Sequence, residues 1–143
     1  NWKQLGGKDQ EIIVINRAQG SGTRAAFEGK VLPKQKALNA QEQESSGTVA
    51  KMVAATPGAI SYVAFSYFKD NVTALAVNGV KPTDQNVMTD TWKIWAYEHM
   101  YTKGKPDLET KKFLDYMRSE EIQTKVVKKL GYISINEMKV KVD

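Results

Sequence analysis

Eight residues near the start of the chain carry the groups best suited to bind an anion. The segment Arg17-Ala-Gln-Gly-Ser-Gly-Thr-Arg24 follows the apolar run Ile12–Ile15 and precedes Ala25-Ala26-Phe27. This order is typical of a strand, a glycine-rich turn and the first turn of a helix. Such a turn directs backbone N–H groups, hydroxyls and a guanidinium toward one small volume, which suits an oxyanion. The predicted anion-binding residues are Arg17, Gly20, Ser21, Gly22 and Thr23.

The two arginines that flank this turn are unusual in a chain whose other cationic side chains are almost all lysines. An arginine fork can hold two oxygens of a tetrahedral anion, whereas lysine is a point charge. We therefore expect Arg17 to be a bidentate ligand; the alternative is a surface arginine paired with Asp9 or a glutamate. Arg24 is expected to tune the local potential or to pair on the helix surface. For Ser21 and Thr23 the alternative role is a simple helix cap.

Other motifs in the chain favour structural roles. Ser45-Ser46-Gly47-Thr48 is a second hydroxyl-rich helix start, for which capping is expected. His99 is the single histidine and the chain has no cysteine, so neither a metal site nor a catalytic triad is expected. No lysine follows Gly22 as a nucleotide-binding P-loop requires, and the glycines around Ser21 are out of register for a hydrolase elbow.

The composition is that of a globular domain. The chain has 143 residues, of which 41% are hydrophobic and 26% charged, and no apolar run approaches the length needed to cross a bilayer. The net charge of +5 comes from lysines spread along the chain. We interpret them as a solvated surface and expect no nucleic-acid partner.

The hydrophobic pattern predicts strands that alternate with helices, and so an α/β fold with a parallel or mixed sheet flanked by helices. In such sheets ligands bind beyond the carboxyl ends of strands, where the Arg17–Thr23 turn lies. Asp107 is expected to cap a long helix, with a break at Ser119 and Gly131 at its end. The expected strands are 12–15, 59–63 and 72–77; the expected helices are 21–30, 48–55 and one from 108 onward; 34–46 is expected to be a surface loop.

The turn resembles the central motif of the PstS-type phosphate-binding proteins of bacterial ABC importers, which are two-lobed, type II solute-binding proteins. Further similar segments occur in the family's order along nearly the whole chain, and they most resemble those of members from Gram-positive bacteria. Ser61 departs from the family's Gly-Ala-Ile-Gly-Tyr pattern, and no ligand contact is assigned to it. The similar segments are Asn1-Trp-Lys-Gln-Leu-Gly-Gly7, Thr56-Pro-Gly-Ala-Ile-Ser-Tyr-Val63, Ile94-Trp-Ala-Tyr97, Phe113-Leu-Asp-Tyr116 and Lys129-Leu-Gly-Tyr132.

The resemblance implies a lobe of a type II periplasmic-binding-protein-like fold that binds inorganic phosphate without catalysis, metal or cofactor. Residues 1–91 would form the phosphate-binding lobe, and residues 92–143 the returning crossover and the C-terminal helices of the other lobe. The N-terminal part of that other lobe, which carries further phosphate contacts, would be absent.

The resemblance also implies partners and a location. An ABC permease in the membrane would be the protein partner, and the protein would be extracytoplasmic, at the cell surface, with a lipid anchor outside this chain. A homodimer could cover the surface left by the missing half.

Three alternatives to a phosphate importer component stay open at this point. The chain could bind another oxyanion such as sulfate or molybdate, or it could be a phosphate-sensing module without a transport role. A phosphatase is disfavoured because the sequence shows no nucleophile with a base or metal.

Overall fold

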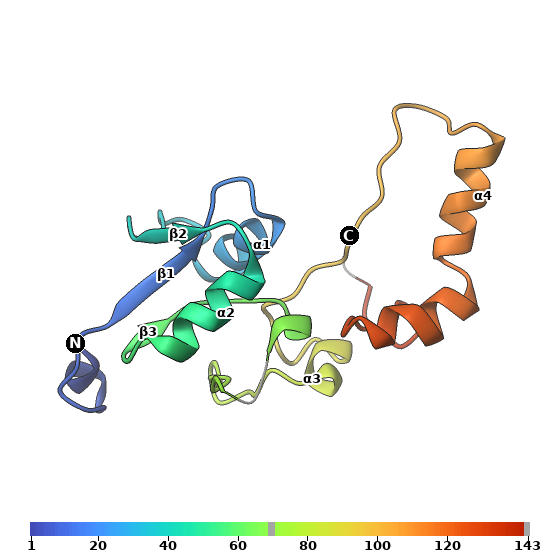
Figure 1. Cartoon of the computed structure of the whole chain (residues 1–143). Helices are drawn as coiled ribbons and strands as arrows, with labels where there is room; N and C mark the ends of the chain where they lie inside the picture. Colours follow the sequence, from blue (N-terminus) through green and yellow to red (C-terminus); the bar gives the residue numbers. More distant parts are fainter. Residues whose placement is uncertain (69–70, 142–143) are drawn as a thin grey trace. The chain divides into compact units, whose positions relative to one another are not determined.

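The computed structural model describes residues 1–68 and 71–141 (Figure 1). The chain divides into two compact units, Asn1–Leu75 and Ala76–Asp143. The predicted division at residue 91 concerns the lobes of a complete two-lobed protein, and it stays a prediction.

The first unit alternates strands with helices. Its elements in chain order are η1 (Trp2–Leu5), β1 (Ile13–Arg17), α1 (Gly22–Val31), β2 (Gln41–Gln43), α2 (Ser46–Ala55), β3 (Ala59–Ile60) and η2 (Phe65–Tyr67).

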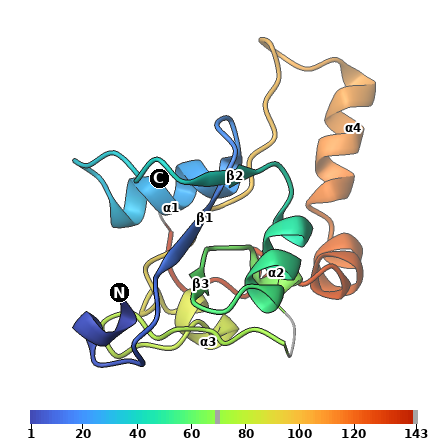
Figure 2. The same cartoon turned by 60° about the vertical axis from the view of Figure 1, so that its left-hand side comes forward.

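A three-stranded parallel sheet forms the centre of this unit. β1 lies between β2 and β3 (Figures 1 and 2), with Arg17 opposite Gln43 and Ile13 opposite Ala59. A central parallel strand is covered on both faces, which explains why β1 begins as an apolar run. Ile15 in β1 is only 1% exposed. The predicted α/β class with a parallel sheet is confirmed.

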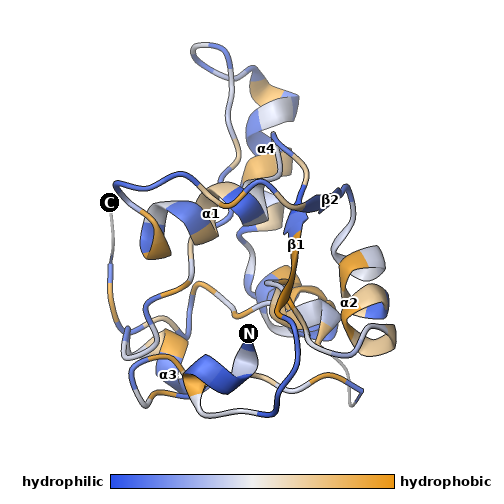
Figure 3. Cartoon of the chain, turned by 90° about the vertical axis from the view of Figure 1, so that its left-hand side faces the viewer, coloured by the Kyte–Doolittle hydropathy of each residue, from blue (hydrophilic) through white to orange (hydrophobic). Residues whose placement is uncertain are grey.

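The two helices α1 and α2 lie on opposite sides of β1 (Figure 3). Strand order explains this arrangement. The connection from β1 to β2 runs in one direction across the sheet, and the connection from β2 to β3 runs back past β1. Since crossover connections between parallel strands are right-handed, a reversal of direction moves the second helix to the other face.

α1 begins at Gly22, next to the predicted residue 21, and α2 begins at Ser46, two residues before the predicted residue 48. The hydroxyl of Ser21 accepts the backbone N–H of Arg24 at 3.3 Å, and that of Ser45 accepts the N–H of Thr48 at 3.0 Å. Each serine has an extended backbone, as an N-cap residue requires.

Three predictions about strands need correction. Residues 34–46 are not all loop, because Gln41–Gln43 pairs with β1 as β2. The strand predicted at 59–63 ends at Ile60. The strand predicted at 72–77 does not form: Val77 makes one isolated antiparallel bridge to Val80 across a turn at Asn78-Gly79. Its apolar residues find no partner strand in the described part of the chain.

The named elements of the second unit are all helices, separated by long irregular segments. They are α3 (Asp84–Met88), α4 (Leu108–Met117) and the π-helical η3 (Ile122–Val127). The predicted break occurs after α4, where Ser119 accepts the N–H of Ile122 at 3.4 Å. Gly131 has the positive φ of 80° expected at a helix end. Within the described residues, no helix is long and apolar enough to cross a membrane.

The stability of the start of α4 should depend on pH through Asp107. Its carboxylate accepts the N–H of Thr110 at 2.7 Å, and this bond to the charged form lowers the pKa of Asp107. The stabilisation is therefore full above the ordinary carboxyl value of 3.8 and is lost as pH falls below it, through the depressed pKa. Amide NMR shifts of residues 108–111 should report this loss on acidification. Asp107→Asn, which keeps a capping oxygen without the charge, should remove this pH dependence.

Candidate functional site

Arg17 is the last residue of β1, and its side chain is enclosed by the end of β2 and the residues that follow it. Its Nε donates to the Gln43 carbonyl at 3.3 Å, Nη1 to the Ser46 hydroxyl at 2.5 Å, and Nη2 to the Glu44 carbonyl at 2.6 Å. The residue is 9% exposed. Because Arg17 and Gln43 are register partners in parallel strands, the side chain at the end of β1 reaches the turn after β2 directly.

The positive charge of Arg17 has no carboxylate partner among the described residues: all three acceptors are neutral oxygens. The expected alternative, a pair with Asp9 or a glutamate, is therefore not formed; Asp9 pairs with Lys3 at 3.2 Å. Buried charges in proteins are usually paired, since removing an ion from water is unfavourable. An unpaired buried guanidinium is thus a ready partner for an anion.

Arg24, at the other end of the turn, is neutralised. Its Nε bonds Glu28 at 2.6 Å, and its Nη1 bonds Glu42 at 2.5 Å. These bonds, first that to Glu42 and then that to Glu28, raise the pKa of the Arg24 guanidinium. Arg24 is ion-paired as predicted, although its side chain is only 12% exposed. Arg17 is left as the cation of this turn without an acidic partner in the described part of the chain.

The N-terminus of α1 offers further hydrogen-bond donors. Ser21 uses its hydroxyl oxygen as the helix cap, which leaves the hydroxyl proton available to another acceptor. Within the described residues, nothing accepts the backbone N–H groups of Gly22 and Thr23, and the Thr23 hydroxyl has no hydrogen bond. Gly20 has φ of +87°, and no atom lies within 4 Å of the position a Cβ would take. The turn is therefore open to a ligand.

Hydrogen bonds fix the turn on the sheet. The Ser21 N–H donates to the Ala18 carbonyl at 3.2 Å, and the Ala18 N–H to the Gln43 carbonyl at 2.9 Å. Nη1 of Arg24 also donates to the Arg17 carbonyl at 2.8 Å. The first turn of α1 is thereby tied back to the end of β1.

This turn follows β1, the strand at which the order of the sheet reverses. The chain passes from β1 to β2 on one side and then returns past β1 to β3 on the other, so the topological switch point lies at the carboxyl ends of β1 and β3. Ligands of open α/β sheets bind in the crevice at such a point. The enclosed Arg17 and the open end of α1 both lie at this edge.

The segment that follows β3 forms hydrogen bonds with the end of β1 and so supports the site. After β3, the Ser61 hydroxyl donates to the Ile15 carbonyl at 2.5 Å, and the Tyr62 hydroxyl accepts the backbone N–H of Arg17 at 3.4 Å. Tyr62 stacks on Phe27 of α1, with ring centroids 4.0 Å apart. Burial raises the pKa of Tyr62, against the opposing effect of the Arg17 N–H. Ser61 has a structural bond, consistent with its exclusion from the predicted ligands.

Sequence reasoning missed the partners of Arg17. Ser46 is 6% exposed and bonds Arg17, whereas the motif that contains it was expected only to cap a helix. The signal that could have found it is position: Ser46 follows β2, and the carboxyl ends of parallel neighbours share one edge. The polar composition of residues 34–46 predicts a loop, and so this signal is not apparent from the sequence.

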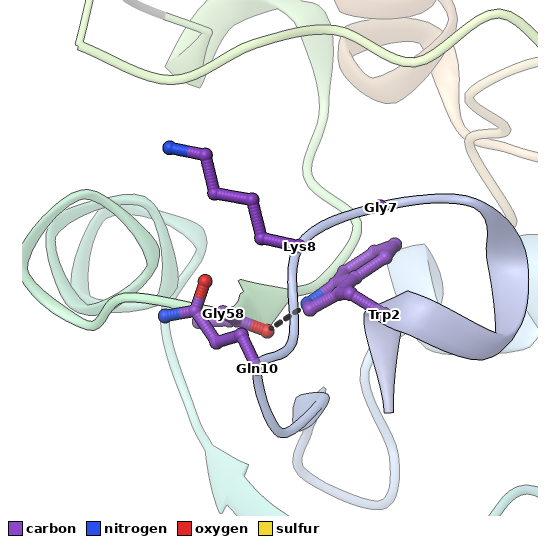
Figure 4. Close-up of a pocket in the computed structure, with 6 residues that line it drawn as sticks. Trp2, Gly7, Lys8, Gln10 and Gly58 are labelled. Atoms are coloured by element: carbon purple, nitrogen blue, oxygen red, sulfur yellow. Dashed lines mark hydrogen bonds between the residues drawn. The ribbon is translucent and has the colours of Figure 1, made fainter.

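A cavity of about 320 Å³ lies elsewhere in the first unit, lined by Trp2, Gly7, Lys8, Gln10, Gly58 and Ala59 (Figure 4). None of these residues belongs to the Arg17–Arg24 turn. The Trp2 indole N–H donates to the Gly58 carbonyl, which also lines this space, at 2.9 Å. In residues 1–68 and 71–141, no cluster of three or more His, Cys, Asp or Glu side chains could hold a metal ion.

Comparison with known proteins gives consistent matches. A family model described as the PBP superfamily domain matches residues 1–121. The chain is 51% identical, over 141 residues, to the phosphate-binding protein PstS of Bacillus subtilis, covering 98% of the chain and 47% of that relative. It is 28% identical over 148 residues to the phosphate-binding protein PstS of Borreliella burgdorferi, covering 94% of the chain and 53% of that relative. The chain thus spans about half the length of the curated relatives it matches.

Solved structures show the same similarity. A protein from Clostridium perfringens, described as a phosphate ABC transporter substrate-binding protein with bound phosphate, is 35% identical with a TM-score of 0.79. That match covers 94% of this chain and 56% of the other. An ABC-type phosphate transport receptor from Vibrio cholerae is 27% identical with a TM-score of 0.74, covering 93% of this chain and 57% of the other.

Proposed function

The chain belongs to the PBP superfamily, and from this membership we propose that it is the phosphate-binding part of a solute-binding protein of an ABC phosphate importer. The observation that carries the proposal is the buried Arg17 guanidinium, which has no carboxylate partner in the described part of the chain. The relatives are named as phosphate-binding proteins, and these names indicate phosphate as the anion. The proposed activity is binding, without catalysis, metal or cofactor.

The proposed phosphate ligands are Arg17, Gly20, Ser21, Gly22 and Thr23. Arg17 would supply the charge and a fork, Gly22 and Thr23 their unbonded N–H groups, and Ser21 and Thr23 their hydroxyl protons. Gly20 would permit close approach of the anion. Each hydrogen bond to a charged group contributes roughly 1.5–3 kcal/mol, and the helix N-terminus adds roughly 0.3–1 kcal/mol.

The whole protein would have two lobes. Residues 1–91 would form the lobe that carries Arg17, and residues 92–143 would return to the other lobe, whose N-terminal part lies outside this chain. Closure of the two lobes would exclude water and present a shape that a membrane permease can recognise. This function implies an extracytoplasmic protein. A lipid anchor and a homodimer stay predictions.

Selectivity for phosphate over sulfate requires an acceptor for the phosphate proton, which sulfate lacks near neutral pH. We propose that the other lobe supplies this acceptor. The chain alone should therefore bind oxyanions weakly and discriminate poorly. Nothing in the described residues favours sulfate, molybdate or a sensing role over phosphate.

An amide NMR titration of the chain with phosphate, with sulfate in parallel, tests the proposed ligands. Phosphate at millimolar concentration should shift the amide signals of Arg17 and of residues 20–24, because these groups would contact the anion. Signals around the cavity at Trp2 serve as an internal control and should stay in place.

Absence of shifts at residues 17–24 in a folded sample would contradict a half-site in this chain. Tight binding of phosphate with little response to sulfate would instead contradict the proposal that the other lobe supplies selectivity.

A further inference from the structure

Two adjacent serines at the start of α2 have different partners. Ser45 is exposed and caps the helix: its hydroxyl accepts the N–H of Thr48 at 3.0 Å and lies 2.8 Å from the Thr48 hydroxyl. Ser46 is buried, and its hydroxyl accepts Nη1 of Arg17 at 2.5 Å, far from it in sequence. Capping therefore accounts for Ser45 and leaves Ser46 with a separate role.

Three acceptors orient the Arg17 guanidinium, one on each nitrogen. A guanidinium has five N–H groups in a planar fork. After these three bonds, one N–H remains on Nη1 and one on Nη2, which is the number a bidentate grip on an oxyanion requires. The contacts that hold the fork thus leave it able to bind.

Only one of these three acceptors is a side chain. The carbonyls of Gln43 and Glu44 belong to the backbone and persist in any point variant, whereas the acceptor on Nη1 depends on the hydroxyl of Ser46. Without that hydroxyl, Nη1 would keep an unmatched buried N–H, and the fork would be held along one side only.

We propose that Ser46 is a positioning residue for phosphate binding, which orients the Arg17 fork without touching the anion. This inference rests on the proposed function. Its specific content is that the effect of Ser46 on affinity passes through the guanidinium of Arg17, whereas the neighbouring Ser45 affects only the helix.

Calorimetric titration of phosphate into the full-length product of the gene that encodes this chain tests the proposal. Ser46→Ala should weaken phosphate binding about 10-fold, the loss of one bond to a charged group. Ser46→Cys, which keeps the side-chain volume but is a weak acceptor, should also weaken it. Ser45→Ala should lower the melting temperature, because it removes a cap, and leave the affinity within about 2-fold.

A double-mutant cycle separates positioning from a general structural effect. In the Arg17→Lys background, which keeps the charge but has no fork, Ser46→Ala should change the affinity less than about 2-fold. Equal losses in both backgrounds, or unchanged affinity in both Ser46→Ala and Ser46→Cys, would overturn the role of Ser46. Failure of the unaltered protein to bind phosphate would instead refute the proposed function.

Discussion

Arg17→Met should lower the phosphate affinity of the full-length gene product by about 100-fold or more. The proposed fork makes two charge-assisted hydrogen bonds, each contributing roughly 1.5–3 kcal/mol, and tenfold in affinity corresponds to about 1.4 kcal/mol. Calorimetric titration with phosphate measures the change directly.

The same variant should keep its melting temperature. Methionine loses the three bonds to residues 43–46, but it also removes a buried charge that has no carboxylate partner in the described part of the chain. The free energy recovered by not burying this charge offsets the loss of the three hydrogen bonds. A large loss of affinity with little loss of stability would identify Arg17 as a residue kept for binding.

Arg24→Met is the matched control, since it removes the other arginine of the same turn. Arg24 bonds Glu28, Glu42 and the Arg17 carbonyl, so its loss should lower stability and weaken binding much less than the loss of Arg17. Wild-type affinity in Arg17→Met, or equal losses in the two variants, would contradict the assignment of Arg17 as the binding cation.

The turn could be predicted from the sequence because its signals are local. Ser21 caps a helix three residues before the N–H it accepts, and the apolar run that precedes Arg17 is the pattern of a central parallel strand. The α/β class and the approximate positions of α1, α2 and α4 can be predicted from the same kind of short-range pattern. The resemblance to a phosphate-binding family identified phosphate as the expected anion.

The surroundings of Arg17 could not be predicted because they depend on pairing between distant segments. β2 has the sequence Gln-Glu-Gln, with no apolar residue, and it is a strand because its backbone bonds to β1. Conversely, the apolar residues of 72–77 resemble a strand but lack a neighbour to pair with in the described residues. Because β2 is not predicted, Ser46 is not predicted as a partner of Arg17. Ser46 comes close to Arg17 only because β1 and β2 pair in parallel register.

The strand order explains why one short segment holds the charge while another offers the open donors. The chain leaves β1 toward α1 on one face and leaves β2 toward α2 on the other, so the two connections separate beyond the carboxyl ends of β1 and β2 (Figure 3). Residues 43–46 enclose the guanidinium from the β2 side, and residues 20–23 stay open on the α1 side. Rigid support and access are thus divided between two connections of the same sheet.

Gly58→Ala should be strongly destabilising, by about 2–4 kcal/mol, which chemical denaturation of the full-length gene product would measure. Gly58 has φ of +82°, and an added Cβ would lie 2.4 Å from the Glu11 carbonyl oxygen. The carbonyl oxygen belongs to the backbone, and the backbone fixes the position of the Cβ, so no rotamer change relieves the contact and one of the two segments must move.

Gly6→Ala isolates the contribution of this contact. Gly6 has nearly the same φ, +83°, but no atom lies within 4 Å of its added Cβ, so only the backbone strain of about 1–2 kcal/mol is expected. Equal losses in the two variants would show that the contact with Glu11 is unimportant. A larger loss in Gly58→Ala has a structural consequence, because the Gly58 carbonyl accepts the N–H of Ile13 at 3.1 Å and begins the pairing of β3 with β1. Moving this residue would disturb the register of the strand that ends at Arg17.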